Sequence, residues 1–356
     1  MELEVVDIDG STMEGGGQGS NLCAEITGLE LMGAEKGSTA FSTKPLIRER
    51  VSGDVVADAG TAGATTLMLQ VALPPFLFMN PFPDACLVLR GGTDVAYSPP
   101  AAHAQLVLAP LLALMGVKLD VNVARRGFNP RGGGELRVTS EMLGNQIHSI
   151  DLTTRGAVVA IRGTVAAERG GSDVAAAVRA SILPLLAALP GCQEAELHVD
   201  IDVEPGAPEG GNKKKRKHKQ GPSVSVQLAA TTDTGCVLSA NLLQDGITNA
   251  GAAAAAVCGE LGALLASGCC VDEHTADQLI VYMALAKGTS RIKCPGASSL
   301  SSQHLPTVLH FVEKVIDVRF FTSATPDGCQ LVECTAYGRM KNQWLTDDIT
   351  ELPPPK

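Results

Sequence analysis

Short glycine-rich turns recur along this chain, and they constrain its fold more than any other feature. The turns read EGGGQ at 14–18, RGGTD at 90–94 and RGGGE at 131–135. Glycine tolerates backbone conformations and close contacts that other residues do not, so each run predicts a tight turn. A strand, a glycine turn, a second strand and a helix follow one another more than once, which indicates a repeated small α/β unit.

The composition favours a mixed α/β protein. Hydrophobic residues make up 45% of the 356 residues, but aromatic residues only 3%. Ala, Gly, Leu and Val must fill the core, which suits close packing of helices on sheets. The formal net charge of −10 argues against a large surface that coats nucleic acid nonspecifically. A site that grips a few phosphates remains compatible with it, because local potential matters more than net charge.

The ten cysteines are scattered, and no two of them form a CxxC pair. A structural zinc site is therefore poorly supported, and we expect buried, reduced thiols in an intracellular protein. The opening MELEVVDIDG lacks the basic and apolar regions of a signal peptide. We expect no membrane span, because the closest candidate, AGAAAAAVCGELGALLASG, is rich in alanine and interrupted by Glu260.

The order of the predicted elements divides the chain into two regions. Residues 170–267 read as a smaller inserted α/β domain, with a disordered, low-complexity basic loop at about 206–222. The remainder, residues 1–169 and 268–356, forms the predicted large domain. Within it, KLDVNVARRGFNPRGGGELRVTS reads as a hairpin of two strands.

One histidine stands at a chemically suggestive position. In SSLSSQHLPTVLHFVEKV, His304 follows a run of serines where a helix begins. Ser301 and Ser302 can cap this helix, so His304 is expected in its first turn. The positive helix end disfavours imidazolium, and the neutral imidazole is the nucleophilic form. By position alone a surface or packed histidine is the commoner case, and His310, six residues on, is interpreted as structural.

Two apolar helices carry further polar candidates. Gln70 lies in TTLMLQVALPPFLF, a helix expected to break at Pro74 and Pro75. Asp277 and Gln278 lie in EHTADQLIVYMALAKG, an amphipathic helix, where a carboxylate and an amide near a buried surface need partners. A role in a site and a role in capping or ion pairing are equally compatible with this position.

Other polar runs have two interpretations each. Glu14, in the first glycine turn, could hold a metal, orient a base or be a solvated turn acid. Arg125, Arg126 and Arg131 surround a tight turn, where guanidinium groups suit phosphate recognition but a solvated hairpin tip is commoner. The basic run KKKRKHK at 213–219 could be a nuclear localisation signal or an RNA-contacting loop, or only a solvated insertion.

The motifs taken in order resemble the RNA 3′-terminal phosphate cyclase family. They are DGSTMEGGGQ, RGGTD followed by SPP, RRGFNPRGGGE, VDEHTADQLIVYMALAKGTSRIK and a helix carrying HLPTVLHFVEK, and they span nearly the whole chain. The resemblance implies a large domain of repeated βαβ-type units with a smaller inserted α/β domain. It implies a ligase that uses ATP and a divalent metal, Mg or Mn, to close an RNA 3′-phosphate to a 2′,3′-cyclic phosphate. The family does so through a covalent histidine–AMP intermediate and an RNA-adenylate.

The resemblance also implies roles for individual residues. His304 falls on the family's nucleophile, and Gln70 on a glutamine that contacts ATP. Pro99, in SPP, matches a proline near the adenine, and Asp277 and Gln278 match an Asp-Gln pair in the nucleotide pocket. The expected partners are therefore ATP and RNA 3′ ends.

The chain departs from the family in several places. Glu14 matches the acid of the first glycine turn and is the candidate metal ligand, but the arginine-rich segment that follows in the family is missing after Gln18. The first unit is thus shortened, and the lost arginines would contact phosphates. His274 stands where the family has a tyrosine that packs on adenine, Ala102 replaces an aspartate, and the run at 213–219 is extra.

Three functional hypotheses remain. The first is the ATP-dependent cyclase, favoured by His304 with Asp277 and Gln278. The second is a catalytically impaired cyclase-like scaffold of RNA processing or ribosome biogenesis, favoured by the missing arginines. The third, an analogy at the level of fold with phosphoenolpyruvate transferases of the aromatic pathway, is disfavoured by the histidine helix. The basic run predicts a nuclear location, in the nucleoplasm with some protein in the cytoplasm.

Overall fold

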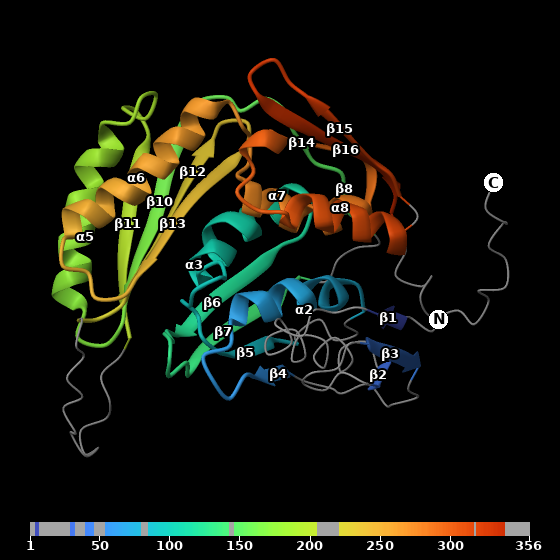
Figure 1. Cartoon of the computed structure of the whole chain (residues 1–356), viewed down its shortest axis with the longest axis horizontal. Coiled ribbons are helices and arrows are strands. Elements are labelled where there is room, and N and C mark those ends of the chain that lie inside the picture. The colour runs from blue at the N-terminus through green and yellow to red at the C-terminus, as the bar shows by residue number, and fades with distance from the viewer. Residues whose placement is uncertain are drawn as a thin grey trace, which may run out of the picture.

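The computed structural model shows a chain of helices and strands, and the strands of its described part form four sheets (Figure 1). It describes residues 54–79, 85–141, 146–204, 221–316 and 318–338, and three strands before them. These are β1 (Glu4–Val6), β2 (Leu29–Met32) and β3 (Ala40–Pro45), which pair in the order β1-β3-β2. The first glycine turn with Glu14, and the basic run at 213–219, lie outside the described residues.

A second sheet, of order β4-β5-β7-β6, contains a βαβ unit and a hairpin. The parallel strands β4 (Val55–Asp58) and β5 (Leu87–Gly91) are joined by α2 (Thr65–Met79), and β6 (Leu119–Arg125) and β7 (Gly134–Ser140) form the predicted hairpin. Gly91 lies opposite Gly134, and a Cβ on Gly91 would come within 2.3 Å of the carbonyl oxygen of Gly63. The glycine turns at 90–94 and 131–135 therefore lie side by side, where only glycine leaves room for the neighbouring backbone.

The helix α2 continues through Pro74 and Pro75, so the predicted break is wrong. A proline inside a helix costs about 3 kcal/mol, because it lacks an N–H donor and its ring crowds the preceding turn. Leu69, Leu73 and Phe76 are each at least 98% buried, and α2 contacts β5 and α7. Burying each such side chain stabilises the fold by about 1.5–3 kcal/mol. Packing therefore outweighs the prolines and keeps the helix intact.

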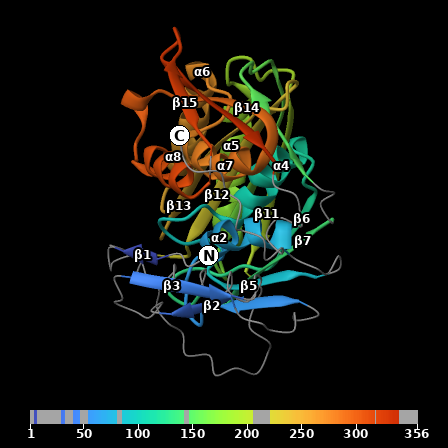
Figure 2. The same cartoon turned by 90° about the vertical axis from the view of Figure 1, so that its right-hand side faces the viewer.

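The third sheet supports the two helices that later prove important. It has the order β15-β16-β14-β8, and β9 also pairs with β14. The helix α7 (Glu273–Leu285) packs on β14 and β16, and α8 (His304–Val315) packs beside α7, as Figures 1 and 2 show. The strands are β8 (Ile147–His148), β9 (Asp151–Leu152), β14 (Ala286–Pro295), β15 (Phe320–Ala324) and β16 (Cys329–Tyr337); the turn η2 (Ala297–Ser299) precedes α8.

Between these two sheets the chain forms a helical segment that ends at a glycine. It consists of α3 (Ala101–His103), a π-helical turn η1 (Ala104–Leu108) and α4 (Ala109–Leu114). Gly116 follows with φ of +84°, a conformation that favours glycine and ends the helix. The segment carries Leu108 and Leu111 into the main core, which joins the second and third sheets.

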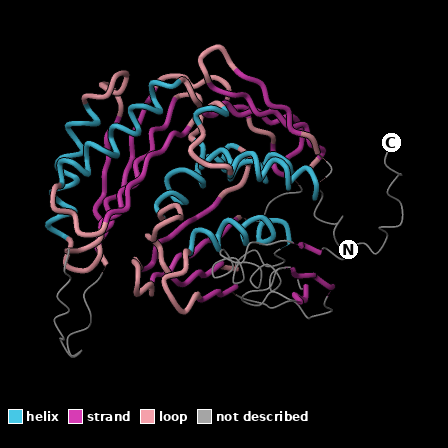
Figure 3. The backbone as a smooth tube through the Cα atoms, viewed as in Figure 1, coloured by secondary structure: helices cyan, strands magenta, loops and turns pink. Residues whose placement is uncertain are grey.

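The fourth sheet has a hydrophobic core of its own. Its order is β11-β10-β12-β13, and α5 and α6 cover one face of it (Figure 3). Its elements are β10 (Val158–Ala167), α5 (Ser172–Ala187), β11 (Glu196–Val203), β12 (Val224–Thr232), β13 (Val237–Gln244) and α6 (Ala250–Ser267). The division of the chain at 170 stays a prediction; the sheet also includes β10, which precedes that position.

The long helix α6 begins and ends at residues that are typical of helix caps. The Asn249 side chain accepts a hydrogen bond from the N–H of Ala252 at 3.0 Å, and Gly268 ends the helix with φ of +82°. Among the described helices, only α6 has the length and apolar composition to cross a membrane, and 33% of it is buried inside the protein.

All nine cysteines in the described part of the chain are free and buried, as expected from their scattered positions. The tenth, Cys23, lies outside that part.

Candidate functional site

A cavity of about 550 Å³ lies between α2, η1, α7 and α8. Its volume falls within the range of small-molecule sites in proteins, roughly 300–1,000 Å³. The segments that form its walls are far apart in the sequence and meet only in the fold. The cavity is lined by Gln70 and Pro74 of α2, Leu108 of η1, Asp277, Gln278, Val281 and Tyr282 of α7, and Gln303, His304, Thr307, Val308 and Phe311 of α8 and its start.

His304 is the first residue of α8, so the prediction that it lies in the first turn is confirmed. Its N–H donates to the hydroxyl of Ser302 at 3.4 Å. Ser301 has a different role from the predicted cap: its N–H donates to Glu273 Oε2 at 2.7 Å, and its hydroxyl also donates to the Glu273 carboxylate. The segment before α8 is thereby tied to the start of α7. The imidazole of His304 is 73% exposed and faces the cavity.

The helix α7 is fixed at its start by a buried carboxylate that the sequence analysis missed. Asp272 accepts hydrogen bonds at 2.8 Å from both the N–H and the hydroxyl of Thr275. It also accepts from the hydroxyl of Ser239, on β13, at 2.9 Å. His103, on α3, lies with Nε2 3.4 Å from the Thr275 hydroxyl. An aspartate before an apolar helix, with a threonine three residues later, is the sequence signal that could have found this cap.

Asp277 lies on the face of α7 that turns toward α8, with Oδ2 3.8 Å from Nδ1 of His304. Its side chain is only 16% exposed. Burial is the main reason that its pKa is raised to about 7; the neighbouring carboxylates of Asp272 and Glu273 raise it further, and His274 opposes the shift. Asp277 therefore gains and loses its proton near neutral pH, within reach of the imidazole. Such a perturbed carboxyl in a cavity is typical of functional sites.

The remaining predicted site residues divide into two groups. Gln70 and Gln278 line the cavity, and the Gln278 amide donates to the carbonyl of His274 at 3.0 Å. Pro99 and His274 are not among the lining residues. The carbonyl of Pro99 instead accepts from the Thr66 hydroxyl at 2.7 Å, and His274 lies exposed, 3.5 Å from Glu273.

The structure therefore brings Gln70, Asp277, Gln278 and His304 together, and their assignment to ATP remains a prediction. Thr307 and Phe311 also line the cavity, although the sequence did not single them out. Their positions three and seven residues after His304, on one face of a helix, are the signal that could have found them.

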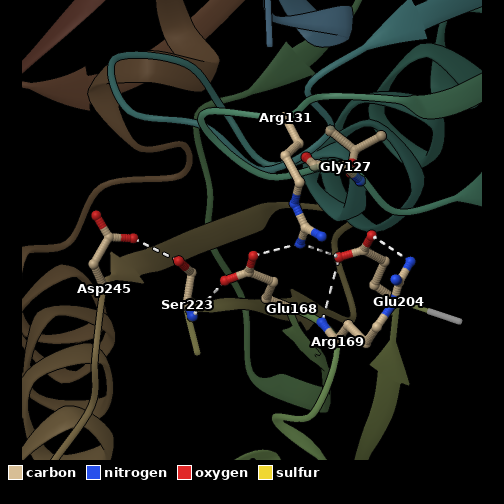
Figure 4. A network of polar contacts seen from close by, with 8 residues as sticks. Gly127, Arg131, Glu168, Arg169, Glu204, Ser223 and Asp245 are labelled. Carbon is tan, nitrogen blue, oxygen red and sulfur yellow. Dashed lines mark hydrogen bonds and ion pairs between the residues drawn. The ribbon is translucent and has the colours of Figure 1, made fainter. Parts of the chain in front are cut away.

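Two of the three arginines near the hairpin are engaged by carboxylates, which corrects the interpretation that they are free for phosphate; Arg131 lies in the exposed hairpin turn, but Arg126 does not. Arg126 is buried, and its guanidinium lies 3.0 Å from Asp94 Oδ2 and 2.7 Å from Asp202 Oδ2. Arg131 donates to Glu168 at 2.5 Å and to Glu204 at 3.2 Å (Figure 4). Both arginines thus join the hairpin to the fourth sheet.

Arg125, by contrast, is exposed on β6. The partners of Arg126 and Arg131 are distant in sequence, so the RRGFNPR motif alone could not reveal them.

The chain matches known proteins over most of its length. Residues 18–322 match the family model described as RNA 3′-terminal phosphate cyclase. An RNA 3′-terminal phosphate cyclase of Pyrobaculum neutrophilum is 32% identical over 302 residues, covering 85% of this chain and 80% of the relative. That of Drosophila melanogaster is 26% identical over 380 aligned positions, covering 95% of this chain and 98% of the relative.

A probable RNA 3′-terminal phosphate cyclase of Dictyostelium discoideum is 29% identical, covering 94% of this chain and 72% of the relative. The match spans both the fourth sheet and the helices that form the cavity. The chain belongs to the RNA 3′-terminal phosphate cyclase family.

Proposed function

We propose that this chain uses ATP to convert an RNA 3′-terminal phosphate to a 2′,3′-cyclic phosphate, with His304 as the nucleophile. The observation that carries the proposal is the pair of His304 and Asp277 at one cavity, 3.8 Å apart. The Asp277 carboxylate faces Nδ1 of the imidazole. A carboxylate in that position favours the tautomer with a proton on Nδ1, which leaves the lone pair on Nε2 available for attack.

In the proposed reaction, Nε2 of His304 attacks the α-phosphorus of ATP. A P–N bond forms, the P–O bond to the β-phosphate breaks, and pyrophosphate leaves. An oxygen of the RNA 3′-phosphate then attacks the same phosphorus, the P–N bond breaks, and AMP is transferred to the RNA. The adjacent 2′-hydroxyl loses its proton as it attacks the RNA 3′-phosphorus, and AMP leaves with the electrons of the P–O bond.

The surrounding residues support binding and proton control. Gln70 and Gln278 supply side-chain amides that can donate to and accept from a nucleotide. Asp277, with its pKa near 7, can take the imidazole proton when the P–N bond forms. The start of α8 adds the positive end of a helix beside the attacking ring, which favours the phosphate oxygens there.

The side chains at this cavity are compatible with a divalent metal that is held in part by the substrate. Among the described residues, no three His, Cys, Asp or Glu side chains come together as a metal site. Mg²⁺ typically uses one or two carboxylates and completes its shell with water and substrate phosphates. Asp277 and the amide oxygens of Gln70 or Gln278 are oxygen ligands of this kind. When bound, such an ion would neutralise charge on the ATP phosphates.

The proposal is tested by incubating the purified chain with ATP, Mg²⁺ and an RNA whose 3′-phosphate is radiolabelled. We expect the label to become resistant to phosphatase as the cyclic phosphate forms, and the His304→Ala protein to leave it sensitive. Exposed His198→Ala is the matched control. The alternative hypothesis, an RNA-processing scaffold without activity, predicts that the label stays sensitive with the unmodified chain and that the RNA is only bound.

A further inference from the structure

An aromatic side chain on the cavity wall is left uncovered by the core. Phe311 lines the cavity and is 55% exposed, whereas Leu305 and Val312 of the same helix are buried. Phe311 lies seven residues after His304, which is two turns of helix and about 10 Å along its axis. The cavity therefore has an imidazole at one end and an exposed aromatic ring farther along the same wall.

A cationic and an aromatic side chain contact the ring. The ammonium of Lys314 lies over the ring of Phe311, 5.9 Å from its centroid. The ring of His310, an exposed residue, meets it edge-on at 5.5 Å and 76°. Arg319 lies farther along the chain, 78% exposed, 3.6 Å from Glu313. Exposed aromatic rings with neighbouring cations are the usual means of binding single-stranded nucleic acid.

The position of the Lys314 ammonium indicates whether Phe311 contacts a base of RNA or the adenine of ATP. The phosphorus of ATP that reacts must lie at His304, and the RNA 3′-phosphate that attacks it must lie beside it. A nucleotide of either kind that reaches Phe311 therefore directs its base there. ATP has its phosphates on one side of the sugar only, and nothing anionic beyond the base. An RNA strand continues past its terminal nucleotide with another phosphate. Lys314, whose ammonium lies near the Phe311 ring, can bind such a phosphate, which a polymer offers and ATP does not.

We propose that Phe311 stacks against the 3′-terminal base of the RNA substrate and that Lys314 binds the phosphodiester preceding that base. This inference rests on the proposed function, because it places the RNA 3′-phosphate next to the AMP phosphorus on His304. Stacking on phenylalanine tolerates any base, since every base has an aromatic face. The site then binds RNA 3′ ends with little preference for sequence.

The inference is tested by fluorescence anisotropy with a short single-stranded RNA that carries a 3′-phosphate and a 5′ dye. Phe311→Ala is expected to raise the Kd by about 5-fold to 150-fold, the effect of losing one stacked base. Phe311→Trp is expected to restore tight binding. The matched control is Phe321→Ala on β15, because Phe321 is also exposed, at 68%, and does not line the cavity.

A second probe lacks only the terminal base. The unmodified chain should bind this abasic RNA as weakly as Phe311→Ala binds the complete one, and Phe311→Ala should bind both alike. Lys314→Ala should weaken binding of every sequence and reduce the slope of log Kd against log salt by about 0.7, the value for one single-stranded phosphate contact. Lys287→Ala, at an exposed lysine on β14, is the control for charge.

Labelling of the protein with α-labelled ATP, without RNA, separates the two ligands. The inference holds if Phe311→Ala weakens RNA binding by a larger factor than it reduces labelling of the protein by ATP. It is overturned if labelling falls and RNA binding does not, because the adenine then lies on Phe311. It is also overturned if neither changes. A chain that binds RNA through Phe311 but forms no protein-bound AMP would contradict the proposed function alone.

Discussion

The replacement Asp277→Asn gives the account a quantitative test, because it removes a buried ionisable group while keeping its shape. The pKa of Asp277 is raised from its ordinary value of 3.8 to about 7, chiefly by burial. The folded state therefore holds the proton more tightly than the unfolded state. Protonation of Asp277 therefore contributes to the free energy of unfolding. This contribution is fully present below pH 3.8 and is lost as the pH rises through about 7.

The size of the effect follows from the two pKa values. At 1.36 kcal/mol per pKa unit, the ionised carboxylate costs about 4 kcal/mol once the pH exceeds 7, and about 2 kcal/mol at pH 5. An asparagine never ionises, so Asp277→Asn should be more stable than the unmodified chain, and the difference should grow by about 2–3 kcal/mol between pH 5 and pH 8.

Guanidinium denaturation at pH 5, 6, 7 and 8 measures this difference. Asp120→Asn, at an exposed aspartate on β6, is the matched control and should show no such growth with pH. The same Asp277→Asn protein should form less protein-bound AMP, because it cannot take the imidazole proton. A difference in stability that is constant with pH, or that reverses sign, would refute the reasoning about burial.

Three further predictions follow from the described contacts and the sequence. Gln70→Ala should raise the KM for ATP about 5-fold, the effect of one lost hydrogen bond, as measured by protein labelling against ATP concentration; an unchanged KM would exclude Gln70 from the ATP site. Arg126→Ala should lower the free energy of unfolding by about 3–5 kcal/mol in chemical denaturation, because it leaves the buried Asp94 carboxylate without its cation, whereas Arg125→Ala, at an exposed arginine, should change it little. Replacing 213–217 with alanine should abolish nuclear accumulation of a fluorescent fusion; an unchanged distribution would reject the nuclear signal.

The sequence predicted those features that depend on local chemistry. His304 opens α8 as predicted, because helix starts are decided within a few residues. Pro74 and Pro75 misled the prediction, since the packing that holds α2 together comes from strands and helices elsewhere in the chain.

The sequence could predict which residues belong to the site, but not how far apart they lie or how deeply they are buried. Asp277 and His304 were both singled out, but their 3.8 Å separation depends on how α7 and α8 pack. The burial that raises the pKa of Asp277 is likewise a property of the fold. Arg126 was interpreted wrongly for the same reason. Its motif suggested that it binds phosphate, but its guanidinium pairs with Asp202, which lies on another sheet.

Protein-bound AMP is the measurement that tests the central claim most directly. The purified chain is incubated with α-labelled ATP and Mg²⁺, and the labelled protein is then treated with acid or base. We predict a label that is acid-labile and base-stable, as expected for a phosphoramidate on histidine, and that is absent from His304→Ala but present in His198→Ala. An unlabelled chain, or a label that persists in His304→Ala, would contradict the assignment of His304 as the nucleophile.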